Sequence, residues 1–418
     1  MLITGVGVVA PNGIGAQMFW RNSLAGCSGI RPISLFEVGS YRCRLAGEIP
    51  EFQPKTSLGP HGLRTLDRTT CLALVAAKLA LDDARLDPAQ VSGRPVGVVL
   101  GSTMGSLRSI SEFDLEGLRE GPRYVNPALF PNAVMNSPAS QVAIRFKLRG
   151  VNSTVSTGFT AALDAMGYAV DLLRLGRADT LVVGGVEELC LQTFLGFYKT
   201  GFLATQIDDA APVFAPFHPR RCGTLLGEGA VMFVVETWDA ALRRGAPVYA
   251  DVLSYRTAFC PPSLRRYDPS IATAAAVLQQ ALDDADVAVE ELDYLSAGAN
   301  STRIVDAIEG AAINRAFGSG AAHVPVSAVK SLVGETFSAA GAFQVASALG
   351  AMVHQQLPPT VRWTQDPFEG ELDLVADQAR EARVETAIVH ATGPTGISSA
   401  LVMRRIADGH PYAGASHE

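Results

Sequence analysis

The stretch VSTGFTAALDAMGYAV, residues 155–170, joins a short β-branched strand to an Ala-rich helix through a glycine and a phenylalanine. Many enzymes mount a nucleophile where a strand turns sharply into a helix, because the turn exposes one side chain near the helix's first free N–H groups. Here that position holds Phe159, whose ring has no nucleophilic atom. The stretch therefore predicts a strand–turn–helix unit with no nucleophile at its turn.

Strand and helix patterns alternate along the rest of the chain. Apolar runs such as LITGVGVVA (2–10), TLVVGGVEE (180–188) and AIVHATG (387–393) are apolar on both faces, as in strands covered by helices on each side. Helical patterns of suitable length lie between such runs, at residues 68–86, 161–176 and 339–356 among others. This alternation predicts an α/β protein.

The length of 418 residues exceeds what one hydrophobic core usually supports, so we expect two closely packed halves. A helical segment from Trp238 ends in Gly-Ala-Pro before a new strand, which suggests a boundary near residue 245. The predicted halves are residues 1–245 and 246–408, and residues 409–418 are a predicted flexible tail. Both halves hold similar strand–helix units, which suggests an internal structural duplication.

Composition excludes several function classes. A net charge of -7 and the absence of long Lys/Arg runs argue against partners such as nucleic acids or membrane surfaces. No apolar run reaches about 18 residues, and the N-terminus lacks a basic signal-peptide region, so we expect a cytoplasmic protein. The six cysteines are scattered without metal-site spacing, which predicts reduced thiols and no metal site.

Several ordered motifs carry a family resemblance over nearly the whole chain. They are FWRNSLAGCSGIRPI (19–33), GRADTLVVGGVEE (176–188), PFHPRRCGTLLGEGA (216–230) and KSLVGETFSAAGAFQVASAL (330–349). Together they resemble the β-ketoacyl-acyl carrier protein synthase family. The resemblance implies the thiolase fold, a duplicated five-layered α-β-α-β-α architecture, and a dimer whose interface passes beside the active sites. It implies no cofactor.

Active members of that family use one cysteine nucleophile and two histidines, and the resemblance implies that all three are missing here. The cysteine position corresponds to Phe159 and the first histidine position to Gly298. The second histidine follows a Lys-Ser-x-x-Gly signature, which begins at Lys330, but its position holds Glu335. The expected set of catalytic residues is therefore empty, with Lys330 retained beside it.

Other reactive side chains lie outside the strand–helix turn. Cys190, Cys222 and His390 are candidates for a rebuilt site, and His218 replaces an acidic residue of a family motif. Structural roles are expected for the first three because no acceptor for an acyl group remains at the helix N-terminus.

Inactive ketosynthases that pair with active ones are the chain-length factors, or ketosynthase-beta subunits, of type II polyketide synthases, and this sequence resembles them. The resemblance implies a heterodimer with an active ketosynthase-alpha subunit, and an acyl carrier protein that holds the chain on phosphopantetheine. Many relatives carry glutamine at the cysteine position, so Phe159 is a departure. Phenylalanine has no amide that could assist malonyl decarboxylation, which disfavours that activity.

Such a subunit would shape a tunnel for the growing polyketide or polyene chain. Ile110 and Phe113 lie at helical spacing within residues 106–122, and Ala133 lies in a segment aligned with the family's acyl-pocket loop. These three are the candidate tunnel residues, although such an apolar stripe is more often ordinary core. Two other functions stay open: an acyl-thioester enzyme, condensing or decarboxylating, with rebuilt catalytic residues, and a homodimeric scaffold.

Overall fold

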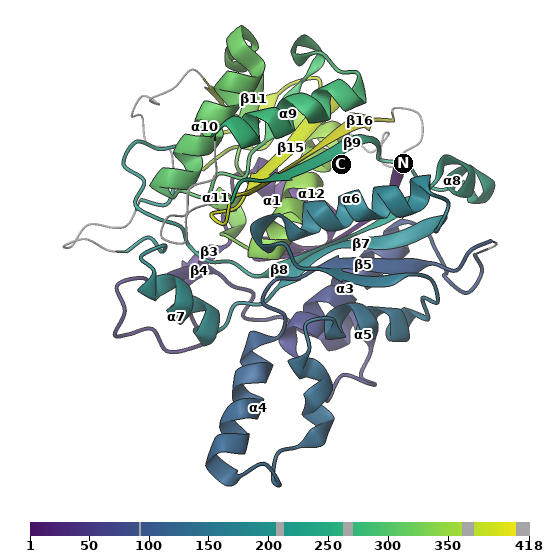
Figure 1. The fold of residues 1–418 in the computed structure, drawn as a ribbon, viewed down its shortest axis with the longest axis vertical. Helices are drawn as coiled ribbons and strands as arrows, with labels where there is room; N and C mark the ends of the chain where they lie inside the picture. Colours follow the sequence, from purple (N-terminus) through teal and green to yellow (C-terminus); the bar gives the residue numbers. More distant parts are fainter. Residues whose placement is uncertain (92, 206–212, 262–270, 362–371, 407–418) are drawn as a thin grey trace.

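The computed structural model describes residues 1–91, 93–205, 213–261, 271–361 and 372–406 (Figure 1). The predicted tail at residues 409–418 lies outside these ranges. Within them, no helix is long and apolar enough to cross a membrane.

Ten strands form two sets with the same order and directions. The first set is β1 (Leu2–Ala10), β5 (Gly97–Gly101), β6 (Asn152–Val155), β7 (Thr180–Glu187) and β8 (Gly229–Glu236). The second set is β9 (Ala250–Phe259), β10 (Tyr294–Ser296), β11 (Pro325–Ser327), β15 (Thr386–Thr392) and β16 (Ile397–Arg405). The strands lie in the orders β6-β5-β7-β8-β1 and β11-β10-β15-β16-β9. In each set the last strand along the chain is antiparallel to both of its neighbours. This repeat confirms the expected duplication.

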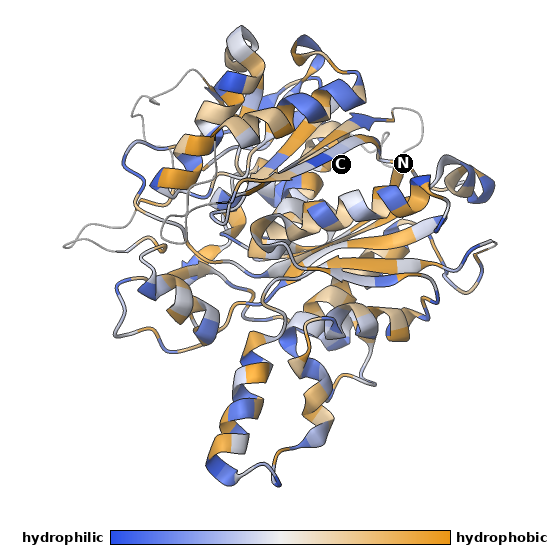
Figure 2. Cartoon of the chain, in the orientation of Figure 1, coloured by the Kyte–Doolittle hydropathy of each residue, from blue (hydrophilic) through white to orange (hydrophobic). Residues whose placement is uncertain are grey.

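Helices cover both sets of strands and separate them, which gives five layers (Figure 1). We call the set that contains β1 the first sheet and the set that contains β9 the second sheet. The middle layer holds α6 (Ala161–Arg174) and α12 (Ala340–His354), and the outer layers hold α3 (Arg68–Asp83) and α5 (Ser137–Phe146) on one side, and α9 (Ile271–Ala285) and α10 (Arg303–Phe317) on the other. Figure 2 shows apolar residues gathered on the strands between these layers. Strands buried on both faces exclude water along their whole length, which explains their continuous apolar runs. The five-layered α-β-α-β-α architecture is confirmed.

The two sets of strands meet at β1 and β9, which pair only at Leu2–Asp251 and Ile3–Ala250. Just before β9, α8 (Trp238–Arg244) ends at Gly245, which has a φ of 60°. Glycine adopts this left-handed conformation without the steric cost of a Cβ atom, so it ends the helix sharply. The domain boundary at residue 245 stays a prediction.

Shorter elements complete the fold, among them two strands that pair with β1 and with β11. They are β2 (Gly13–Ile14), α1 (Ala16–Leu24), β3 (Ile30–Pro32), β4 (Leu45–Gly47), α2 (Pro54–Leu58), α7 (Leu191–Lys199), α11 (Lys330–Val333), β12 (Gln356–Leu357), β13 (Asp373–Leu374) and β14 (Arg380–Glu381), with the 3₁₀ helices η1 (Pro127–Ala133), η2 (Gly158–Thr160), η3 (Val289–Glu291), η4 (Gly318–His323) and η5 (Phe337–Ala339).

One helical hairpin extends away from the layers (Figure 1). It consists of α4 (Leu107–Glu120) and η1, and we call residues 107–136 the arm. No residue of α4 is buried, so the interpretation of its apolar stripe as ordinary core is wrong. Helical periodicity identifies an apolar face but not what covers it, and here much of that face is open. The exposed apolar residues of the arm are Leu115, Leu118, Tyr124, Leu129, Phe130, Val134 and Met135.

The candidate tunnel residues all lie on the arm. Ile110 and Phe113 are half-buried on α4, and Ala133 is half-buried at the end of η1. The Phe113 ring lies 6.0 Å from the Phe130 ring between centroids, so an aromatic contact joins the two helices of the hairpin. α4 also packs against α7, which connects the arm to the body of the protein.

Candidate functional site

The strand–turn–helix unit predicted at residues 155–170 is present. β6 ends at Val155, η2 forms the turn, and α6 begins at Ala161. Gly158 has a φ of 85°, a left-handed conformation that strains residues with a Cβ atom. The glycine therefore permits the tight turn that places Phe159 just before α6.

A single carboxylate holds this turn in place. Asp164, in the first turn of α6, accepts hydrogen bonds from Thr160 Oγ1 at 2.9 Å and from Thr157 Oγ1. Its other oxygen accepts from Tyr255 Oη and Ser399 Oγ, both at 2.6 Å. A carboxylate near a helix N-terminus also interacts favourably with the helix dipole. Asp164 thus fixes the turn to strands β9 and β16 of the second sheet.

Phe159 belongs to an aromatic cluster in front of the helix. Its ring is 5.4 Å from that of Phe337, 6.0 Å from that of Phe202 and 6.3 Å from that of Phe197, measured between centroids. All three contacts are edge-to-face, the arrangement that aromatic quadrupoles favour. Phe159 is only 7% exposed. The cluster fills the space that faces the first turn of α6.

Gly298 lies in the loop after β10 and is held at both ends of its backbone. Its N–H donates to Glu309 Oε1 at 2.9 Å, and its carbonyl accepts from Lys330 Nζ at 2.7 Å. A Cβ atom at this position would lie 3.0 Å from Ala391 Cα and 3.0 Å from the His390 carbonyl oxygen. These distances are shorter than ordinary contacts, so a side chain here requires the backbone of β15 to move.

Glu335 is fully buried, and three donors bind its carboxylate. Its Oε2 atom accepts from Lys330 Nζ at 2.9 Å and from Asn300 Nδ2 at 3.0 Å, while Oε1 accepts from the Phe337 N–H at 2.9 Å. The Lys330–Glu335 ion pair is 2% and 0% exposed at its two side chains. A carboxylate with these partners is a structural anion rather than a free base.

These contacts join Phe159, Gly298 and Glu335 into one site. Glu335 binds the backbone of Phe337, and the Phe337 ring packs on Phe159. Lys330 connects Glu335 to Gly298. The structure therefore brings together all four residues that the motifs singled out.

His390 forms a second buried polar group behind Gly298. Its Nδ1 atom lies 2.7 Å from Glu309 Oε1, and Nε2 lies 2.9 Å from Ser398 Oγ. Carboxylate, imidazole and hydroxyl thus follow the order of a hydrolytic triad. His390 and Glu309 are fully buried and Ser398 is 1% exposed, so the hydroxyl does not reach a substrate. The geometry supports a positioning role for His390, through the Glu309 carboxylate that also binds Gly298.

The other reactive candidates are engaged elsewhere. Cys190 is buried, its Sγ atom lies 3.3 Å from Thr193 Oγ1, and burial raises the pKa of its thiol. Cys222 Sγ donates to the Val213 carbonyl at 3.5 Å, and His218 Nδ1 accepts from the Arg220 N–H at 3.0 Å. None of these side chains is at the N-terminus of α6. Among the described residues, no group of three or more His, Cys, Asp or Glu side chains could hold a metal ion.

A pocket of about 290 Å³ opens beside the aromatic cluster. Phe202 of the cluster lines it, together with Cys222, the N-terminal residues of α10 and Pro394 of the turn between β15 and β16. Phe159 is not among the lining residues. The pocket therefore ends at the aromatic cluster and does not reach the turn before α6.

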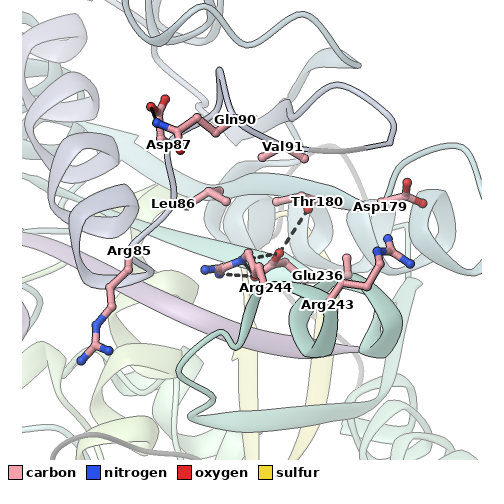
Figure 3. Close-up of a pocket in the computed structure, with 11 residues that line it drawn as sticks. Arg85, Leu86, Asp87, Gln90, Val91, Asp179, Thr180, Glu236, Arg243 and Arg244 are labelled. Carbon is pink, nitrogen blue, oxygen red and sulfur yellow. Dashed lines mark hydrogen bonds and ion pairs between the residues drawn. The ribbon is translucent and has the colours of Figure 1, made fainter.

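A second, polar pocket has a volume of about 240 Å³ and lies at the opposite ends of the strands of the first sheet (Figure 3). It lies at the start of β7, beside Thr180, whereas the site lies at the end of the parallel strand β6. Glu236 accepts hydrogen bonds there from Thr180 Oγ1 at 3.2 Å and from Arg244 Nε at 3.0 Å. The Glu236 carboxylate is already paired with Arg244 within the fold. The pocket is not part of the candidate site.

Comparison with protein families assigns the chain to one family. The model of the β-ketoacyl synthase N-terminal domain matches residues 1–241, and the model of the C-terminal domain matches residues 249–364. The chain belongs to the β-ketoacyl synthase family.

Relatives and solved structures of this family match over nearly the full length. The tetracenomycin polyketide synthase ketoacyl synthase alpha subunit of Streptomyces glaucescens is 37% identical, over 97% of each chain. The 3-oxoacyl-[acyl-carrier-protein] synthase 2 of Coxiella burnetii is 32% identical, over 98% of this chain and 99% of the relative. The structure of the ishigamide ketosynthase/chain length factor superposes with a TM-score of 0.89 at 30% identity, covering 97% of this chain and 98% of the other.

The motifs did not reveal several residues that complete the site. Asn300 binds Glu335, and Phe197 and Phe202 enclose Phe159. Asn300 lies two residues after Gly298, so its place in the loop was the one available signal. The two phenylalanines lie on and just after α7, and nothing in their local sequence indicates that they face residue 159.

Proposed function

We propose that this chain is a non-catalytic ketosynthase-like subunit, a chain-length factor, that pairs with an active ketosynthase. Together they would build a polyketide or polyene chain on an acyl carrier protein in a type II polyketide synthase. The observation that carries this proposal is the closed site: an aromatic ring precedes α6, and a buried ion pair occupies the position of the second histidine. The phenylalanine ring has no nucleophilic atom that could accept an acyl chain, and the Glu335 carboxylate is engaged by Lys330, Asn300 and the Phe337 N–H.

The similar structures support this choice of partner class. One contains a ketosynthase with a chain length factor, and another, with a TM-score of 0.86 at 27% identity, is titled as a type II polyketide synthase acyl-carrier protein in complex with its ketosynthase. The curated relatives include active-type names such as a ketoacyl synthase alpha subunit. The choice of the non-catalytic role therefore rests on the residues at positions 159, 298 and 335 of this chain.

A rebuilt acyl-thioester enzyme fits the geometry less well. His390 lies beside Gly298, and both of its ring nitrogens are engaged in buried hydrogen bonds. Cys190 is a buried thiol with a raised pKa, so little nucleophilic thiolate is present at neutral pH. A decarboxylase or condensing activity would need one of these groups to leave its present partners.

The arm supplies the surface that we assign to the partner. It exposes a run of large apolar side chains, including Leu118 at 84% and Tyr124 at 75% exposure. Monomeric proteins rarely leave extended apolar patches open, and such patches mark interaction sites. The arm also carries the candidate tunnel residues, so a partner bound here would cover them and enclose a tunnel between the two subunits.

Co-expression with an active ketosynthase tests the proposal directly. We expect the two chains to co-purify in equal amounts and the mixed complex to extend malonyl units on an acyl carrier protein. The purified chain alone is expected to show neither condensation nor malonyl decarboxylation, measured by mass spectrometry of the carrier-bound products. A stable homodimer that binds no ketosynthase would favour the scaffold function, and activity of the chain alone would favour the rebuilt enzyme.

Replacing Leu118 with aspartate is expected to weaken pairing at least tenfold, because a charge would have to be buried at the interface. The side chain is 84% exposed in the isolated chain, so the substitution leaves the fold intact. Leu242→Asp is the matched control, since Leu242 is 69% exposed on α8, far from the arm (Figure 1). Pull-down titration measures both variants, and equal pairing by L118D and wild type would contradict the assigned surface.

The tunnel residues Ile110, Phe113 and Ala133 remain proposals within this function. Enlarging Ala133 to phenylalanine is expected to shorten the products of the complex by at least one extension, because close-packed walls accommodate extra atoms poorly. Product length is measured by mass spectrometry. Ala128→Phe, on the outer part of η1 where the side chain is exposed, serves as the control. Unchanged products from A133F would count against a wall role for this position.

A further inference from the structure

Two adjacent buried glutamates hold the segment that leads into the arm. Glu187, at the end of β7, is fully buried, and its Oε1 atom accepts from the Thr103 N–H at 2.9 Å and from the Met104 N–H at 3.1 Å. Ser102 Oγ donates to the same oxygen at 3.1 Å. Three consecutive residues before the arm are thus bound by one carboxylate.

Glu188, the next residue after Glu187, binds the backbone at the start of α4. It is 3% exposed, and its Oε1 atom accepts from the Arg108 N–H at 3.2 Å, in the first turn of α4. The residue before α4, Ser106, makes no side-chain capping bond to the helix. A carboxylate at this end supplies the missing acceptor and a favourable charge for the helix dipole.

The same segment touches the degenerate site. Thr103 Oγ1 donates to the Gly158 carbonyl at 2.9 Å, directly before Phe159. Thr69 Oγ1 on α3 donates to the Gly105 carbonyl at 3.2 Å. The position of the arm is therefore coupled to the turn that carries Phe159.

Neither glutamate has an ion-pair partner of its own within the described ranges. The cations nearby are engaged: Arg68 pairs with Glu228 at 2.6 Å and Arg108 pairs with Glu112 at 2.8 Å. Burial raises the pKa of both Glu187 and Glu188 to about 7. The Glu187, Asp67 and Glu228 carboxylates raise the pKa of Glu188 further, and the Ser338 hydroxyl lowers that of Glu187. The guanidinium groups of Arg68 and Arg108 also interact with Glu188, while Glu48 acts on Arg68 and Cys190 acts on Arg108.

We propose that Glu187 and Glu188 are positioning residues for the arm, which hold residues 102–108 when ionised and release them when protonated. The arm would then present its pairing surface in one fixed orientation above neutral pH and loosen below it. Hydrogen bonds to an ionised acceptor are roughly twice as strong as those to a neutral one, and this difference drives the change. The inference rests on the proposed function, in which the arm binds the partner subunit.

Lowering the pH has opposite effects on the stability of the fold and on the hydrogen bonds from the two glutamates to the arm. With their raised pKa values, the two glutamates bind more protons in the folded than in the unfolded chain between about pH 4.5 and about pH 7. Their contribution to stability is therefore fully present at low pH and is lost as pH rises toward 7. Lowering the pH from about 8 to about 6 stabilises the fold through these groups while it weakens their hydrogen bonds to the arm.

Hydrogen–deuterium exchange of the intact chain near pH 6 and near pH 8 tests this positioning role. After correction for intrinsic exchange rates, protection of the amides at residues 103–108 is expected to be about fivefold to tenfold lower near pH 6. Glu187→Gln and Glu188→Gln are each expected to remove part of this pH dependence, and the double variant is expected to remove all of it. Glu112→Gln, at an exposed acid on α4, is the matched control and keeps it.

Equal protection at both pH values in the wild-type chain, or an unchanged pH dependence in both single variants, would overturn the inference. The thermal midpoint of each variant, followed by circular dichroism, identifies any general loss of folding. Affinity for the ketosynthase is measured separately, and we expect weaker pairing near pH 6 for wild type and E112Q but not for the glutamine variants at 187 and 188. Absence of pairing at every pH would overturn the proposed function, while the exchange data would still decide the positioning role.

Discussion

Replacing Glu335 with alanine is expected to lower the free energy of unfolding by about 3–5 kcal/mol. The substitution leaves the Lys330 ammonium group buried, with the Gly298 carbonyl as its remaining acceptor. It also removes the acceptor for Asn300 Nδ2 and for the Phe337 N–H, two further buried donors. Denaturant unfolding followed by circular dichroism measures the loss.

A double substitution separates the ion pair from the rest of the site. Lys330→Met combined with Glu335→Leu removes both charges while keeping apolar volume, and is expected to recover most of the stability lost in E335A. Asp284→Ala is the surface control, because the Arg256–Asp284 pair is 48% and 38% exposed and such pairs contribute about 1 kcal/mol or less. A loss in E335A as small as that in D284A would contradict the assigned role of the buried pair.

The architecture was predictable because burial on both faces of a strand leaves a direct trace in the sequence. Runs such as residues 2–10 and 180–186 are largely apolar on both faces, and they became β1 and most of β7 of the covered sheets. The arm was not predictable in the same way. Its apolar positions have helical spacing whether another part of the chain covers them or a second subunit does, so the spacing of Ile110 and Phe113 could not separate core from interface.

The order of the motifs singled out Phe159, Gly298 and Glu335, but it did not predict the contacts that these residues make. The bond between His390 and Glu309 joins residues 81 positions apart, and the bond between Lys330 and Gly298 joins residues 32 apart. Such pairs depend on how the strands β10 and β15, the helices α10 and α11 and the loop after β10 pack together in space. A single sequence gives the residue types that could pair, and tertiary packing selects which of them do.

Replacing Phe159 with alanine is expected to lower the free energy of unfolding by about 3–5 kcal/mol, since the ring is buried and contacts three other aromatic rings. Phe130→Ala on the arm is the control, because that ring is 56% exposed and its removal is expected to cost less than about 1 kcal/mol. Denaturant unfolding measures both variants. A cost for F159A no larger than that for F130A would show that the cluster does not stabilise the closed site.

Restoring a thiol at the same turn separates packing from chemistry. Phe159→Cys returns a potential nucleophile to the N-terminus of α6, where the helix dipole favours a thiolate. The isolated variant is nevertheless expected to show no condensation and no malonyl decarboxylation, because Gly298 offers no base and Glu335 stays committed to Lys330. Mass spectrometry of malonyl-loaded carrier protein measures both reactions. Turnover by F159C alone would mean that only the residue at position 159 keeps this chain from catalysis. The expected lack of turnover would mean that the residues at positions 298 and 335 prevent catalysis as well.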